Sequence, residues 1–254
     1  MPSYYFNVKT VRKGNAAAQA NYVARRGKTY EDRTDLVATG CGNLPEWANA
    51  SFFNFASAAD RGERKNGAAV KETTFALPRE LPLHINMEIV GEFCKKYLSG
   101  KPHLLAIHAP PAAIGTGLQP HVHILNSDRV LDEHQRSPQQ HFARYNAANP
   151  EKGGCRKDSG AKTNSEFRQR LIDQRLFVAK AQNDALEQIG CNERVDHRSL
   201  RDRGVARAPE PKFGPLRARQ LSEGQRQELR TLRELQRSEP TEVALPHPFH
   251  VPEV

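Results

Sequence analysis

Three histidines in two neighbouring segments have the spacing of a metal site. His121 and His123 lie two residues apart in PHVHILNS, and His108 ends the preceding apolar stretch HLLAIHA. Residues two apart on a β-strand point to the same face, so both imidazoles can reach one ion. A third nitrogen from His108 would leave coordination positions open for a substrate oxygen, as a catalytic metal requires. The alternative is an unligated histidine pair on a solvated strand face.

Glu72 offers a carboxylate in the segment VKETTFALP, which has the composition of a strand ended by Pro78. In an extended strand Glu72 and Thr74 share one face. A carboxylate here could act as a general base or hold a ligand histidine through its ring N–H. An exposed glutamate without a chemical role is the alternative.

Tyr22 is followed at short range by the cations Arg25, Arg26 and Lys28. A tyrosine hydroxyl is mostly protonated at neutral pH, so it attacks phosphorus only if a base removes its proton or cations stabilise the phenolate. The nearby cations could also bind a phosphate. An aromatic side chain packed among alanines is the alternative interpretation of Tyr22.

The elements that must position these residues alternate between strands and helices. Residues 3–11 are rich in aromatic and β-branched side chains and predict a strand, and the alanine-rich residues 16–26 predict a helix that ends before Gly27. The stretch FFNFASAADRGER is helix-prone, and the strand VKETTFALP follows it. Tyr22 is therefore expected on the first helix.

The histidine strands follow an amphipathic helix. Apolar residues recur at helical spacing over residues 85–98 and stop before Gly100. HLLAIHA at 103–109 and PHVHILNS at 120–127 then predict two adjacent strands joined by PPAAIGTGLQ. Residues 165–190 predict a long helix with a glycine stop at Gly190. This order of elements predicts an α+β layer fold.

The end of the chain predicts a smaller, basic region. Three prolines interrupt residues 204–221, and Ser222 with Gln225 forms a capping-box pattern that opens an Arg-rich helix to about residue 237. The proline-punctuated residues 239–254 are predicted to be disordered. We expect one main domain over residues 1–215 and a basic helix with a tail over residues 216–254.

The charge of the chain favours an anionic partner. The formal net charge is +9, and the positive excess is larger over residues 151–237 than over residues 1–150. Nucleic acid, an anionic membrane and an acidic protein all fit such an excess. No signal-peptide pattern and no apolar run of spanning length is present, so we expect a soluble, cytoplasmic protein. Four scattered cysteines lack both zinc-site spacing and disulfide density, which indicates reduced thiols.

Taken together, the motifs from about residue 3 to about residue 215 resemble the MobA/MobL family of plasmid mobilisation relaxases, in the wider HUH endonuclease group. The resemblance rests on five stretches in the same order along the chain: ANYVARRGKTY, KETTFALP, LAIHA with PHVHILNS, FARYNAANPEKGG and VDHRSL. It implies a palm-like antiparallel sheet flanked by helices, followed here by a basic helical extension.

The resemblance also implies roles for the residues named above. Tyr22 aligns with the family nucleophile, and Glu72 falls where the family places an active-site acid. The metal ligands align with His108, His121 and His123. Two features depart from relatives: Thr74 stands where some carry a second acid, and the loop between His108 and His121 is longer. The identity of the proton acceptor therefore stays open.

The implied reaction is the nicking of one DNA strand at an origin of transfer, with a 5′-phosphotyrosine adduct that can be carried to a recipient cell and later rejoined. The expected cofactor is a divalent metal ion, Mg²⁺ or Mn²⁺. The expected partners are single-stranded DNA, relaxosome accessory proteins and a type IV secretion coupling protein. Alternatives are a non-cleaving origin-binding or repressor protein, and a rolling-circle replication initiator or transposase of the HUH group.

Backbone contacts to DNA are expected from cations on and near the motifs. Arg25, Arg26 and Lys28 follow the tyrosine, and the loop segment RYNAANPEKGG contributes Arg144 and Lys152. An ordinary surface turn is the alternative for RYNAANPEKGG. The arginines of VDHRSLRDRG could equally contact DNA or lie in a salt-bridged face.

Overall fold

The computed structural model describes residues 4–112, 114, 117–158, 160–206 and 220–238. The chain divides into two units, one formed by residues 1–110 and 118–196, the other by residues 111–117 and 197–254. The first unit holds every strand of the sheet. The predicted tail, residues 239–254, lies outside the described residues. The predicted boundary near residue 215 does too.

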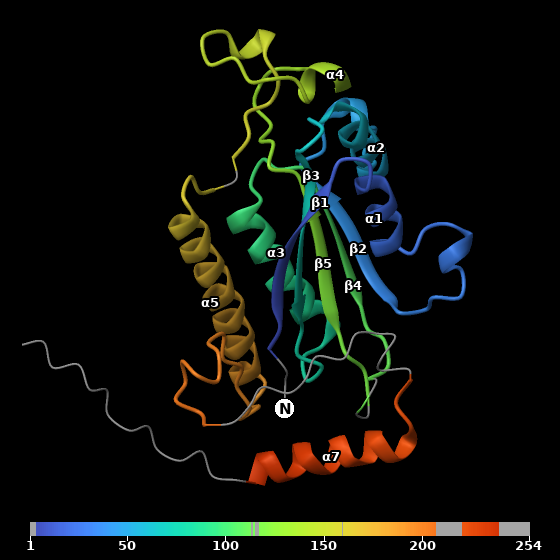
Figure 1. The fold of residues 1–254 in the computed structure, drawn as a ribbon, viewed down its shortest axis with the longest axis vertical. Helices are drawn as coiled ribbons and strands as arrows, with labels where there is room; N and C mark the ends of the chain where they lie inside the picture. Colours follow the sequence, from blue (N-terminus) through green and yellow to red (C-terminus); the bar gives the residue numbers. More distant parts are fainter. Residues whose placement is uncertain (1–3, 113, 115–116, 159, 207–219, 239–254) are drawn as a thin grey trace, which may run out of the picture. The chain divides into compact units, whose positions relative to one another are not determined.

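A five-stranded antiparallel sheet forms the centre of the first unit (Figure 1). Its spatial order is β1-β3-β5-β4-β2, so the two histidine strands are neighbours in the middle of the sheet. The strands span β1 Phe6–Arg12, β2 Leu36–Gly42, β3 Ala68–Ala76, β4 His103–His108 and β5 His121–Asn126. The predicted α+β architecture and the pairing of the two histidine strands are confirmed.

The edge strand β2 is not predicted by the sequence. Its segment LVATGCG contains two glycines, a residue type depleted in strands, and lacks a continuous apolar run. As an edge strand it pairs only with β4, and its residues alternate between half-buried and exposed. Tertiary pairing rather than local propensity makes this segment a strand.

Two helices, α1 Ala16–Val23 and α2 Phe52–Gly62, cover one face of the sheet (Figure 1). They pack on a core to which the sheet contributes Val70, Leu104 and Leu125. The N terminus of α1 has no cap of its own. Instead Asp60 of α2 accepts hydrogen bonds from the backbone N–H groups of residues 14, 16 and 17 at 2.7–2.9 Å. This carboxylate satisfies three free donors and complements the helix dipole.

The other face of the sheet is covered by α3 Leu83–Tyr97 and α5 Asn164–Gln188 (Figure 1). An aromatic core with Phe75 and Phe93 joins them to the sheet. The α5 helix begins at a capping box of Thr163 and Glu166, and Gln182 donates to the Ala76 carbonyl at 2.7 Å. Both predicted helices are confirmed.

Residues 127–157, here called the arginine-anchored segment, follow β5 and contain the short elements α4 Pro138–His141 and η3 Pro150–Lys152. The buried Arg129 donates to the carbonyl oxygens of residues 141, 142, 143 and 155 and to Glu63 at 2.6 Å. Arg136 donates to the Gly153 and Pro150 carbonyls and pairs with Asp132. Two guanidinium groups thus hold this segment together, and Phe142 packs it against the core of the first unit.

The second unit contains the helix α7 Glu223–Ser238. Ser222 and Gln225 form both hydrogen bonds of the predicted capping box, at 2.9 and 3.2 Å. Within the same unit Arg230 donates to the Ile114 carbonyl at 3.1 Å. None of the helices in the described ranges is long and apolar enough to cross a membrane.

Candidate active site

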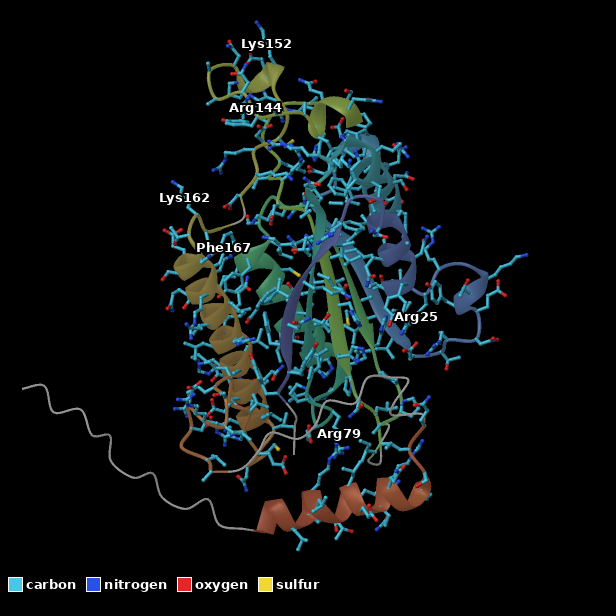
Figure 2. The ribbon with its side chains drawn as sticks, in the orientation of Figure 1. Arg25, Arg79, Arg144, Lys152, Lys162 and Phe167 are labelled. Atoms are coloured by element: carbon cyan, nitrogen blue, oxygen red, sulfur yellow. The ribbon has the colours of Figure 1, made fainter. Side chains whose placement is uncertain are left out.

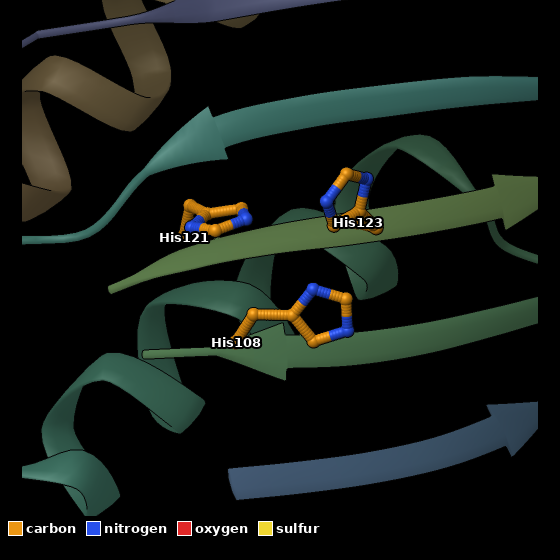
Figure 3. A group of neighbouring side chains, drawn as sticks. All are labelled: His108, His121 and His123. Atoms are coloured by element: carbon orange, nitrogen blue, oxygen red, sulfur yellow. The ribbon is translucent and has the colours of Figure 1, made fainter. Parts of the chain in front are cut away.

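The register of the two central strands brings the three histidines together. His108 of β4 pairs directly with His121 of β5, and His123 lies two residues further along β5 on the same face. All three side chains project from the same face of the two strands (Figure 3), and His108 contacts the Val23 carbonyl of α1 on this face. One nitrogen from each ring lies within 4.8 Å of the others. This cluster has the size and donor chemistry of a three-imidazole metal site.

Each ring is oriented by a protein oxygen that accepts from one of its nitrogens. His121 Nδ1 lies 2.9 Å from the Gln119 carbonyl, and His108 Nε2 lies 2.7 Å from the Val23 carbonyl. Glu72 Oε1 lies 2.6 Å from His123 Nδ1. Such contacts fix the tautomer, so a metal would bind the other nitrogen of each ring.

The environment of His108 and His121 favours the neutral imidazole, the form that binds metals. Burial is the main reason why the pKa of His108 falls to about 4. Burial also lowers the pKa of His121. The residues present therefore fit a bound cation.

Glu72 lies fully inside the protein beneath α1, with only 1% of its surface exposed. Besides His123, its carboxylate accepts from Lys9 Nζ at 2.9 Å and from Gln19 Nε2 at 2.8 Å. Burial alone would raise the pKa of Glu72, but the hydrogen bonds from His123 and Lys9 outweigh it and hold the pKa below its usual value. A carboxylate held ionised by three donors orients His123 well and is a weak proton acceptor.

Thr74 stands opposite His123 in the register of β3 and β5. Its hydroxyl lies 3.3 Å from His123 Nδ1, the nitrogen that Glu72 also contacts. Thr74 therefore shares the predicted face with Glu72 and supports the same ring.

Tyr22 lies in the last turn of α1, at the edge of the histidine cluster. Its side chain is 40% exposed, and its ring centroid is 6.4 Å from that of His123. Tyr30 packs edge-on against it at 5.9 Å. The phenol is thus held beside the imidazoles but is open to solvent.

Arg25 does not extend into solvent as a simple phosphate contact would. Its Nε and Nη2 atoms donate to the two oxygens of Asp35 at 2.9 and 2.7 Å, and this hydrogen bonding raises the pKa of Arg25. Nη1 donates to the Tyr22 carbonyl at 2.9 Å, Nη2 lies 3.2 Å from His108 Nδ1, and the guanidinium carbon is 4.9 Å from the Tyr22 ring centroid.

The other predicted DNA-contact residues are exposed. Arg26 stacks on Phe53 with its guanidinium carbon 3.8 Å from the ring centroid, and Lys28 begins the short helix η1 Lys28–Tyr30. Arg144 and Lys152 lie together in the arginine-anchored segment, far along the first unit from Arg25 (Figure 2). The predicted DNA-contact residues therefore form two separated groups.

Three supporting residues are not predicted by the sequence. Lys9 and Gln19 hold Glu72, and Asp35 holds Arg25. Lys9 could have been found, because strand alternation and pairing place it opposite Glu72. Asp35 could not, because it immediately precedes the unpredicted strand β2.

Curated relatives match most of this chain. It is 37% identical over 209 residues to the 43 kDa relaxation protein of Salmonella typhimurium, covering 82% of this chain and 56% of the relative. It is also 37% identical over 221 residues to mobilization protein A of Escherichia coli, covering 85% of this chain and 30% of the relative. The chain thus spans about half or less of the length of these relatives.

A solved structure from work on the molecular basis of vancomycin resistance transfer in Staphylococcus aureus shares the fold. It superposes with a TM-score of 0.52 at 21% identity, covering 77% of this chain and 98% of the other. The MobA/MobL family model matches residues 5–223, nearly the whole described part of the chain. The fold, the order of the motifs and this match show that the chain belongs to the MobA/MobL family.

Proposed function

We propose that this chain is a DNA relaxase that nicks one strand at a plasmid origin of transfer through Tyr22. The observation that carries the proposal is the position of a solvent-open tyrosine ring 6.4 Å from a histidine of a three-imidazole cluster. A tyrosine with only a packing role would have no reason to be 40% exposed or to lie beside His123. The names of the curated relatives, a relaxation protein and a mobilization protein, support the same activity.

The proposed reaction is a transesterification. The Tyr22 hydroxyl oxygen attacks phosphorus and gives up its proton, and the bond from phosphorus to the 3′ oxygen breaks. The products are a 5′-phosphotyrosine and a strand whose 3′ oxygen gains a proton to become a hydroxyl. One phosphodiester replaces another, so no energy source is consumed and the step can reverse to rejoin the strand.

The three histidines are the proposed ligands of a divalent ion, Mg²⁺ or Mn²⁺. When bound, such an ion supplies a Lewis acid that stabilises negative charge on a phosphate oxygen. Glu72 is proposed as a positioning residue for His123, because its carboxylate already accepts three hydrogen bonds. The proposed proton acceptor for Tyr22 is therefore a solvent water molecule and not Glu72.

Arg26, Lys28, Arg144 and Lys152 are proposed to contact the DNA backbone, since their side chains are exposed cations. The proposal extends to relaxosome accessory proteins and a type IV coupling protein as partners, and to the cytoplasm as the site of nicking. These partners and this location are proposed for a whole mobilisation protein. The two curated relatives are longer than the part that matches this chain.

The decisive experiment mixes purified protein and Mn²⁺ with labelled single-stranded oligonucleotides that tile the transfer origin of the host plasmid. We expect a covalent adduct that survives denaturing electrophoresis with the wild type. Tyr22→Phe should give none, because the attacking oxygen is removed. Adduct formation by Tyr22→Phe would contradict the proposed nucleophile. DNA binding without any adduct would favour the non-cleaving origin-binding alternative.

A second variant separates cleavage from binding. His121→Ala removes one imidazole from the cluster and leaves the exposed cations unchanged, so nicking should fall below detection while oligonucleotide affinity, measured by fluorescence anisotropy, stays within about threefold. Full nicking activity in this variant would remove the histidine cluster from the mechanism.

A further inference from the structure

Arg25 and His108 are joined by a hydrogen bond whose direction the surroundings define. His108 Nε2 lies 2.7 Å from the Val23 carbonyl oxygen, which can only accept, so Nε2 carries the proton. In the neutral ring Nδ1 then has a lone pair, and Arg25 Nη2 donates to it at 3.2 Å. Both nitrogens of His108 are thus engaged by the protein.

Ligation of a metal by His108 is incompatible with this hydrogen bond. If Nδ1 binds the metal, its lone pair is no longer available to Arg25. If Nε2 binds the metal instead, the ring proton moves to Nδ1, and two N–H donors then face each other. Either arrangement breaks the contact between Arg25 and His108.

We propose that metal binding at His108 releases one N–H of Arg25, and that this donor then binds the phosphodiester that Tyr22 attacks. The inference rests on the proposed function and adds to it a link between metal loading and substrate binding. Arg25 is thereby a phosphate-binding residue only in the metal-loaded protein. This also explains why a cation in the tyrosine motif is turned inward.

The released donor stays beside the reacting atoms because Asp35 holds the guanidinium. Arg25 Nε donates to Asp35 Oδ1 and Nη2 uses one hydrogen on Asp35 Oδ2, so only the second Nη2 hydrogen is freed. The guanidinium carbon lies 4.9 Å from the Tyr22 ring centroid. A phosphate oxygen is the acceptor that best satisfies a charged donor at this place.

The backbone at Arg25 supports a dedicated role. Arg25 has a φ of 52°, in the left-handed region, and the Arg26 N–H bonds the Asn21 carbonyl at 2.9 Å to close the end of α1. This helix-end position normally favours glycine. An arginine held there against its backbone preference is the kind of strain that accompanies function.

The first test measures Mn²⁺ affinity by isothermal titration calorimetry without DNA. The double variant Arg25→Met/Asp35→Asn removes the donor that competes for His108 and leaves the net charge unchanged. We expect metal affinity to rise about tenfold. If Arg25 only positioned the His108 ring, its removal would lower the affinity. An unchanged or lower affinity overturns the proposal. Arg33→Met/Asp32→Asn, in exposed residues of the same loop, is the matched control and should leave affinity unchanged.

The second test uses nuclear magnetic resonance on Tyr22→Phe protein, which retains Arg25 and His108 and forms no adduct. Saturating Zn²⁺ should shift the guanidinium N–H signals of Arg25 together with the ring nitrogens of His108. A short oligo-dT should then shift the Arg25 signals further with Zn²⁺ present and leave them in place without it. The proposal is overturned if Zn²⁺ does not shift the Arg25 signals. It is also overturned if the oligonucleotide shifts them equally with and without Zn²⁺.

These measurements are independent of covalent adduct formation. A protein that forms no adduct can still show competition between Arg25 and the metal. An active relaxase can equally show none. Failure of this inference and failure of the proposed function are therefore distinguishable.

Discussion

At the scale of single residues, the site is built from side chains that hold other side chains. Glu72, Gln119 and Val23 each provide an oxygen to one histidine ring. Removing such an oriented acceptor from a metal site typically lowers metal affinity by about 10–100-fold. The contribution of the residues that orient the histidines should therefore be measurable as a change in metal affinity, without an activity assay.

Replacing Glu72 by glutamine tests this directly. Glu72→Gln keeps the shape but loses the charge that accepts from His123, so Mn²⁺ affinity measured by calorimetry should fall about tenfold. Glu88→Gln, an exposed substitution on α3, is the matched control and should leave affinity unchanged. Equal affinity of the Glu72 variant and wild type would show that the carboxylate does not support the metal site.

The sequence predicts the histidine cluster because strand alternation is a strictly local rule. His121 and His123 must share a face of any strand, and His108 follows once the two strands pair. The contact between Arg25 and Asp35 obeys no local rule. It depends on the left-handed backbone of Arg25 after α1 and on the position of the edge strand β2. The two glycines of β2 prevent its prediction from the sequence.

At the scale of elements, Glu63, which directly follows α2, connects this helix to the arginine-anchored segment. The Glu63 carboxylate is buried and accepts from Arg129 at 2.6 Å and from Lys157 at 2.9 Å. Burial alone would raise the pKa of Glu63, but these two cations outweigh it and the pKa lies below the ordinary 4.5. The sequence indicates only a loop here, because buried guanidinium groups leave no apolar pattern to detect.

Acid should therefore weaken this connection. A carboxyl group whose pKa is lower in the folded state stabilises the fold above its unfolded pKa, and that stability is lost as pH falls below 4.5 toward the folded value. We expect the wild type to lose unfolding free energy between pH 5 and about pH 3 more steeply than Glu63→Gln, as measured by urea denaturation. The variant should be less stable at neutral pH. If unfolding free energy falls with pH equally in the wild type and the variant, the pKa of Glu63 is the same in the folded and unfolded states.

At the scale of the whole first unit, the central sheet separates the two groups of cations. The histidine cluster lies at the start of β5, and the arginine-anchored segment begins where β5 ends. Five residues of strand span roughly 17 Å. DNA contacts at Arg144 and Lys152 would then lie several nucleotides away from the scissile phosphate.

Salt dependence can test that separation. Arg144→Gln/Lys152→Gln should reduce the slope of log affinity against log salt by about 0.7 for each single-strand phosphate that the variant no longer neutralises. This reduction should appear with long oligonucleotides and vanish with short ones centred on the nick. Lys95→Gln/Arg168→Gln removes two exposed cations from α3 and α5 and is the control. Equal slopes for all three proteins would exclude Arg144 and Lys152 as DNA-binding residues.

The anchor of α1 has a mechanical consequence. In the proposed reaction a DNA strand becomes attached to Tyr22, near the C-terminal end of α1, and any pull on that strand loads this short helix. The opposite end of α1 is tied to α2 by the Asp60 carboxylate, which grips three backbone N–H groups. Tension on the adduct would therefore be resisted by the Asp60 carboxylate together with the packing of Ala16, Ala20 and Val23 in the core. Asp60 is thus one of the attachments that hold the covalently bound strand to the body of the protein.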